Sequence, residues 1–202
     1  MPDRLRDKKD KIASRLYTRK LESLLADEGN TLHRCAFCAK LFTSAQREWE
    51  PCLRAPPLMD FHGNPIAEHV PNRSWDVHRW VGSLRRSKGG AREAYWRLWG
   101  LTHFLSCSTC DTQFPVCEFE QCAYHPSEPV FDRGDHRGVF PCCQQPAMRF
   151  DSTSDRRPRG CQFRRHTPVI RPPIGVTGAA AEATARQAAK IVEIVRRARR
   201  LG

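Results

Sequence analysis

The sequence predicts an α+β fold of small units with short strands and irregular loops, flanked by amphipathic helices at both ends. Fifteen prolines and 12 glycines among 202 residues imply many turns. Ten cysteines gather in two stretches, and apolar side chains recur at helical spacing elsewhere. A chain with this composition leaves each unit little apolar interior, so each unit needs a cross-link or a bound metal to stay folded.

Helices are expected over residues 3–27, 91–105 and 177–201, because apolar residues recur there at intervals of three and four. The first is an amphipathic packing helix. One face of the second carries Tyr95, Leu98, Trp99 and Thr102. The last begins at Thr177 as its cap, and its apolar seam comprises Thr184, Ala188, Ile191, Val195 and Ala198.

The cysteines indicate either disulfides or metal, depending on the compartment. Residues 1–20 are dense in charge and contain no apolar core of a signal peptide, which favours an intracellular protein, nuclear or cytoplasmic, with metal-bound thiolates. No stretch approaches the roughly 18 apolar residues of a membrane span, so no membrane association is expected.

The main metal-binding pattern is four short ligand pairs within 60 residues. Structural zinc takes four Cys or His ligands, and a short pair lets one turn aim two ligands at one ion. The pairs are Cys107 and Cys110, Cys122 and His125, Cys142 and Cys143, and Cys161 and His166. Eight ligands predict two closed, structural zinc sites. Spacing leaves the pairing of ligands open, and Cys117 or His103 could replace a ligand.

The run from Cys122-Ala-Tyr-His-Pro through Cys142-Cys143 to Gly160-Cys161 and His166-Thr167 resembles the CHORD zinc domain. The resemblance covers residues 107–167, about a third of the chain, and implies a module with two zinc ions. That family includes adaptors that contact a chaperone ATPase domain. A weaker similarity connects the segment to the cysteine-rich C-terminal part of SANT- and BTB-domain chromatin regulators.

The sequence departs from the CHORD pattern at four places. The opening pair of this chain is closer in sequence than the family's. Family glycine, histidine and tryptophan positions are occupied by Ser127, Asp132 and Phe140. If the family histidine is a ligand, Asp132 or Cys117 must substitute for it, so the unit is CHORD-like and a chaperone partner is not carried over.

The first cysteine cluster repeats the beginning of the second. Cys35-x2-Cys38-x3-Phe, then Glu-Trp-Glu-x-Cys52, matches Cys107-x2-Cys110-x3-Phe, then Glu-Phe-Glu-x-Cys122. The repetition indicates duplication of a zinc half-unit and predicts a third zinc ion. Its fourth ligand must come from another position, and the candidates are His62, His69 and His33. We favour His62, because a glycine follows it.

These features divide the chain into four parts. We expect an N-terminal helix in residues 1–30, a degenerate zinc half-repeat with a basic loop in 31–90, a CHORD-like two-zinc domain in 91–170, and a proline linker with a basic C-terminal helix in 171–202. Residues 53–90 read as a long connection. Residues 156–202 hold 12 Lys and Arg against 2 Asp and Glu, a net charge of +10.

Closed zinc sites predict an adaptor or scaffold that binds a protein partner through its helices and the zinc module. The alternative is a nucleic-acid-associated protein that binds the phosphates of RNA or DNA through the basic region from Arg156 to Arg200. No open metal position, phosphate-binding loop or nucleophile motif is visible, so the sequence predicts no enzyme.

Overall fold

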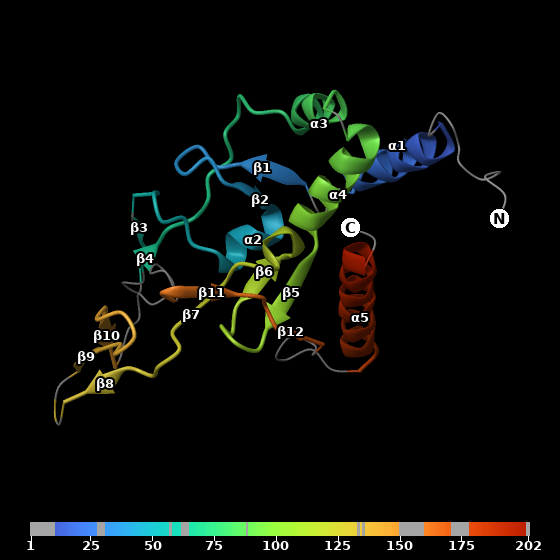
Figure 1. The fold of residues 1–202 in the computed structure, drawn as a ribbon. Helices are drawn as coiled ribbons and strands as arrows, with labels where there is room; N and C mark the ends of the chain where they lie inside the picture. Colours follow the sequence, from blue (N-terminus) through green and yellow to red (C-terminus); the bar gives the residue numbers. More distant parts are fainter. Residues whose placement is uncertain are drawn as a thin grey trace. The chain divides into compact units, whose positions relative to one another are not determined.

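The computed structural model describes residues 11–27, 31–56, 58–61, 65–87, 89–132, 134, 136–149, 160–170 and 178–200. It divides the chain into two compact units, Met1–Thr102 and His103–Gly202. Both contain short strands in small antiparallel sheets together with helices, so the predicted α+β class is confirmed. Figure 1 shows these elements in chain order.

Unit 1 joins a small helical core to a compact cysteine-containing segment. Helix α1 (Lys11–Leu25) precedes β1 (Leu32–Arg34) and β2 (Leu41–Thr43), which pair antiparallel. The remaining elements are α2 (Ser44–Trp49), β3 (Leu58–Met59), β4 (Pro65–Ile66), α3 (Val77–Arg85) and α4 (Gly90–Thr102).

Helix α4 is the centre of the core of unit 1, because it packs against both α1 and α3. The predicted face is confirmed as the buried one: Tyr95, Leu98, Trp99 and Thr102 are all buried. The ring of Tyr17 from α1 contacts that of Tyr95 at 5.5 Å. Helix α4 therefore belongs to unit 1, which ends at Thr102. The prediction that the second domain begins at residue 91 is wrong for this helix.

Helix α3 lies within the stretch that the sequence analysis interpreted as a connection. Asp76 caps it, since its carboxylate accepts a hydrogen bond of 2.6 Å from the backbone N–H of Arg79. Val81 is the buried residue that faces inward. Nine residues with one buried position give too weak a periodicity to stand out among prolines and charges.

Among its described residues, unit 2 contains eight short strands, one 3-10 turn and one long helix. They are β5 (Phe104–Cys107), β6 (Gln113–Pro115), the 3-10 turn η2 (Val116–Glu118), β7 (Cys122–Tyr124), β8 (Val130–Phe131), β9 (Arg137–Val139), β10 (Pro146–Met148), β11 (Gln162–Arg164), β12 (Pro168–Val169) and α5 (Ala179–Arg200). The sheets are ordered β12-β5-β6, β11-β7 and β10-β9-β8.

Helix α5 confirms the predicted C-terminal helix and the part of its apolar seam from Thr184 to Val195. Ile191 and Val195 are buried and Ala188 is half-buried, while Arg186 and Lys190 are exposed. Thr177, the predicted cap, and Leu201 lie outside the described residues. Within the part of the chain that the structure describes, no helix combines the length and apolar character that crossing a membrane requires.

Candidate metal centres

Cysteine and histidine side chains converge in three groups of four, and within each group the ligand atoms lie no more than 4.8 Å apart. Site 1 consists of Cys35, Cys38, Cys52 and His69. Site 2 consists of Cys107, Cys110, Cys122 and His166. Site 3 consists of His125, Cys142, Cys143 and Cys161. Each group could hold one metal ion through three sulfurs and one nitrogen.

The spacing of the ligand atoms fits zinc. Tetrahedral zinc with its usual bond lengths places two sulfurs about 3.8 Å apart and a sulfur and a nitrogen about 3.6 Å apart. The Sγ atoms of Cys35 and Cys52 are 3.8 Å apart, as are those of Cys107 and Cys122.

Sulfur–nitrogen distances agree equally well. The Nδ1 atom of the site histidine lies 3.5 Å from Cys38 in site 1 and 3.6 Å from Cys110 in site 2. In site 3 it lies 3.5 Å from Cys142 and 3.6 Å from Cys143. The sulfur–sulfur separations of 3.8 Å in sites 1 and 2 far exceed the roughly 2.05 Å of a disulfide bond, and none of the ten cysteines forms one.

Sites 1 and 2 each begin with the same hairpin loop. The backbone N–H of Cys35 donates to the carbonyl of Lys40 at 2.8 Å, and that of Cys107 donates to Thr112 at 3.0 Å. The residue before each of these acceptors has positive φ, 60° at Ala39 and 52° at Asp111. This turn aims both cysteines of the Cys-x2-Cys pair to one side, which is why the spacing recurs.

The loop also directs backbone donors at the first sulfur. The N–H of Phe37 donates to the Cys35 sulfur at 3.4 Å, and that of Thr109 donates to Cys107 at 3.3 Å. Such bonds favour the thiolate over the thiol, and the thiolate is the form that binds metal.

The histidines of sites 1 and 2 arrive on equivalent segments. The carbonyl of Val70, directly after His69, accepts from the N–H of Ala36 at 2.8 Å. The carbonyl of Thr167, directly after His166, accepts from the N–H of Ser108 at 2.9 Å. The duplication therefore extends to the fourth ligand, and its sequence signal is His-x-Pro, present as His69-Val-Pro and His166-Thr-Pro.

Each histidine ligand is oriented by a phenylalanine. Phe42 stacks on His69 at 5.0 Å, Phe114 on His166 at 3.7 Å, and Phe140 on His125 at 3.7 Å between ring centroids. The Nε2 atom of His69 is buried and has no hydrogen-bond partner among the described residues. Stacking rather than a polar partner at Nε2 therefore holds the ring of His69.

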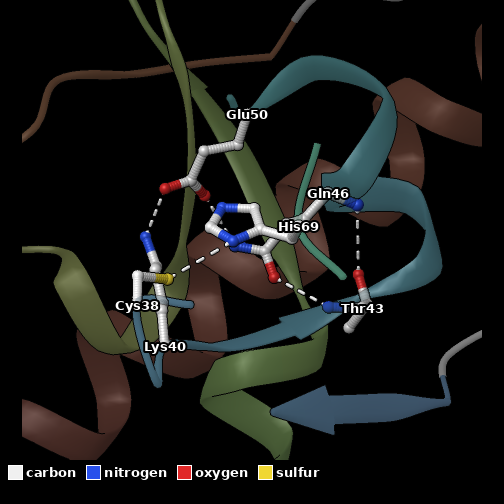
Figure 2. A network of polar contacts seen from close by, with 6 residues as sticks. All are labelled: Cys38, Lys40, Thr43, Gln46, Glu50 and His69. Carbon is white, nitrogen blue, oxygen red and sulfur yellow. Dashed lines mark hydrogen bonds and ion pairs between the residues drawn. The ribbon is translucent and has the colours of Figure 1, made fainter. Parts of the chain in front are cut away.

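A network of hydrogen bonds and one ion pair connects helix α2 to the loop of site 1. The side chain of Gln46 is buried and completes a capping box with Thr43 at the start of α2. The carboxylate of Glu50 accepts from Gln46 and pairs with Lys40, which belongs to the metal-binding loop. Figure 2 shows this network beside the contact of Cys38 with His69. Helix α2 is thereby tied to the loop that carries the first two ligands.

Site 3 lies on an insertion within the second repeat. Strand β11 pairs with β7, with Arg164 opposite Cys122, and in unit 1 the N–H of Cys52 donates to Ala67 at 2.6 Å. Both contacts occur two residues before the histidine ligand. Between Cys52 and Ala67, the described residues of unit 1 form only the β3–β4 hairpin. The corresponding segment of unit 2, between Cys122 and Arg164, contains β8, β9, β10 and the ligands of site 3.

The β9–β10 loop of site 3 is a variant of the same hairpin. The N–H of Phe140 donates to the carbonyl of Gln145 at 2.9 Å, and Gln144 has a φ of 59°. Phe140 thus occupies the place that Cys35 and Cys107 occupy in the other loops. The two ligands follow it as adjacent residues, and both Cys142 and Cys143 belong to the same site.

Crowded thiols change one another's protonation. Burial raises the pKa of Cys35 and Cys107, but backbone N–H groups and the site histidine outweigh it and lower each pKa to about 6. Burial and the neighbouring thiols raise the pKa of Cys38 to about 11 and that of Cys122 to about 12. Several thiolates can therefore coexist at neutral pH only with a cation between them.

The structure groups all eight ligands predicted in the second half of the chain into sites 2 and 3 and resolves their pairing. In the first half it joins His69, one of the alternatives, to the three predicted cysteines. His62, the favoured residue, lies outside the described residues. The three groups do not include His33, His103, Cys117 or Asp132.

Comparison with known proteins does not assign the chain to a family, so its classification depends on the geometry of the three Cys/His groups. No family model matches the chain. No solved structure matches it significantly. The three Cys/His groups are compatible with a structural module that binds metal ions.

Proposed function

We propose that the chain is a zinc-dependent adaptor that holds three structural zinc ions and binds a protein partner. The observation that carries the proposal is closure. Each site supplies four protein ligands at the spacing of a zinc tetrahedron, which leaves no position for a substrate or an activated water. The same closure supports a protein without enzymatic activity.

Zinc in these sites supplies folding free energy. Structural zinc contributes about 10–16 kcal/mol of apparent binding energy in small domains. The sheets of unit 2 have two or three strands of at most four residues, so they bury little without the ligands. The CHORD resemblance supports two of the ions, at sites 2 and 3, and the repeat supports the third.

Native mass spectrometry of the purified, reduced chain tests the zinc part of the proposal. We expect three zinc ions per chain, and chelation should abolish the near-UV circular dichroism of both units. A folded chain without zinc would refute it. The adaptor part predicts capture of a partner that survives nuclease treatment and is lost when zinc is chelated.

The alternative function is binding to RNA or DNA through the basic C-terminal region. It is supported by the exposed side chains of Arg164 on β11 and of Arg186, Lys190 and Arg196 on α5. Arg156 and Arg157 lie outside the described residues. Phosphate binding releases counterions, so affinity should fall steeply with salt. Fluorescence anisotropy with a labelled oligonucleotide measures this, and an absence of salt dependence would exclude it.

A further inference from the structure

The three sites differ in how far they are open to solvent. In site 1 the side chains of Cys35 and Cys52 are 2% and 1% exposed, and in site 2 those of Cys107 and Cys122 are 1% and 0% exposed. Their histidines are buried as well. In site 3 all four ligands are only half-buried.

The surroundings of the sites account for this difference. Cys35, Cys52 and Phe42 form one buried apolar cluster, against which Cys38 also packs. Site 2 is next to the buried rings of Phe114 and Phe119, which contact one another at 5.9 Å. Three of the four ligands in each of these sites are thus part of a core that excludes water and larger reagents, while Cys38 and Cys110 are half-buried.

Site 3 lies between exposed segments. Every residue of β11, which follows Cys161, is exposed, and so are Gln144 and Gln145 in the loop. Phe140 covers one side of His125 and is itself half-buried. A small reagent dissolved in water can therefore reach the sulfurs of site 3 more readily than those of sites 1 and 2.

Two sulfurs of site 3 are also placed to react with each other. The Sγ atoms of Cys142 and Cys161 are 3.5 Å apart. A disulfide requires these atoms to approach to about 2.05 Å. The movement needed is small, and neither sulfur is enclosed by a core that would resist it.

We propose that site 3 is an oxidant-sensitive zinc site, at which a hydroperoxide converts Cys142 and Cys161 to a disulfide and expels the metal. The proposal rests on the proposed function, because it requires zinc in the sites. Sites 1 and 2 keep their metal under the same treatment, so the protein would lose one ion while both units retain a structural zinc.

The reaction balances with hydrogen peroxide as the oxidant. The thiolate of Cys142 attacks one peroxide oxygen, the O–O bond breaks, and the departing hydroxide takes a proton to leave as water. The thiolate of Cys161 then displaces hydroxide from the sulfenic acid on Cys142, and a second proton makes a second water. Two thiolates, one peroxide and two protons from the solvent yield one disulfide and two waters, and Zn2+ leaves a site that retains only two ligands.

The test treats the zinc-loaded full chain with hydrogen peroxide, in a Cys117→Ser background that removes an exposed thiol outside the sites. A metallochromic dye follows released zinc, and differential alkylation with mass spectrometry maps disulfides. We expect an early phase that releases one third of the bound zinc, together with a Cys142–Cys161 disulfide. Reduction and added zinc should reverse both.

Two variants provide matched controls. Cys161→Ser removes the second thiol of the reaction and should abolish the early phase, whereas Phe163→Ala changes an exposed side chain on β11 that belongs to none of the three sites and should leave that phase intact. Release of all the zinc in one phase, or an early disulfide in site 1 or 2, would overturn the inference. A protein purified without zinc would instead refute the proposed function before any peroxide is added.

Discussion

Replacing Phe114 with alanine tests whether the histidine-stacking phenylalanines maintain the metal sites. Phe114 is 3% exposed, stacks on His166 at 3.7 Å and contacts Phe119 edge-on at 5.9 Å. Truncating a buried phenylalanine costs about 3–5 kcal/mol of folding free energy, as a lost transfer term plus a cavity. The substitution also removes the ring that fixes the orientation of a ligand.

The effect should appear as weaker zinc binding, because metal binding and folding are coupled in such a unit. At about 1.4 kcal/mol per tenfold, the cost corresponds to a loss of about 100- to 4,000-fold in the apparent affinity of site 2. Titration of the zinc-loaded chain with a chelator of known affinity measures this, with a dye reporting the released metal.

Phe163→Ala is the matched control. Phe163 lies in the same unit, on β11, but its side chain is 71% exposed. Its truncation should shift the chelator titration little, because surface substitutions usually change stability by less than about 0.5 kcal/mol. If Phe114→Ala left the titration unchanged, or if both variants shifted it equally, the assignment of a structural role to the stack would be refuted.

Three further predictions follow from sites 1 and 2. His69→Ala should lower the number of zinc ions per chain, counted by native mass spectrometry, from three to two, while His62→Ala should leave it at three. The opposite result would identify His62 as the fourth ligand of site 1. Ala39→Gly should stabilise unit 1 by about 0.5–1 kcal/mol in urea unfolding, because Ala39 has a φ of 60°, where a side chain is strained; a loss of stability would contradict this. The pKa of Cys35 and of Cys107 is lowered to about 6. A thiol with a lowered pKa stabilises the folded, metal-binding state at high pH, and this contribution is lost as pH falls through the lowered pKa. Zinc should therefore be retained at neutral pH and released as pH drops below about 6. A dye assay across pH measures the release, and full retention far below that value would count against thiolate ligands.

Local patterns predicted much of this architecture. The buried face of α4 and the seam of α5 could be read from periodicity, because a helix that packs on a core needs apolar residues every three or four positions. The α+β class followed from many turns between short apolar runs. Helix α3 was missed because its nine residues bury only Val81, so its cap at Asp76 was the sole local signal.

The order of the residues already shows which side chains could bind metal, and it shows that the first cluster repeats the beginning of the second. Ligand spacing within a turn is a local property, so Cys35 and Cys38, like Cys107 and Cys110, could be paired from sequence. Which pairs could share an ion depends on how distant segments meet in the fold. The tertiary structure places His166 with Cys107, 59 residues earlier in the chain, through the pairing of β12 with β5.

The tertiary structure also places His69 in site 1 and distinguishes site 3, whose four ligands are half-buried, from sites 1 and 2, in which three of four ligands are buried. The reason is physical. A metal site closes when strands from distant parts of the chain pair and bring their side chains to one point, and strand pairing depends on the whole fold. Spacing along the sequence determines which neighbouring ligands can bind the same ion. The pairing of strands determines which distant ligands complete the site.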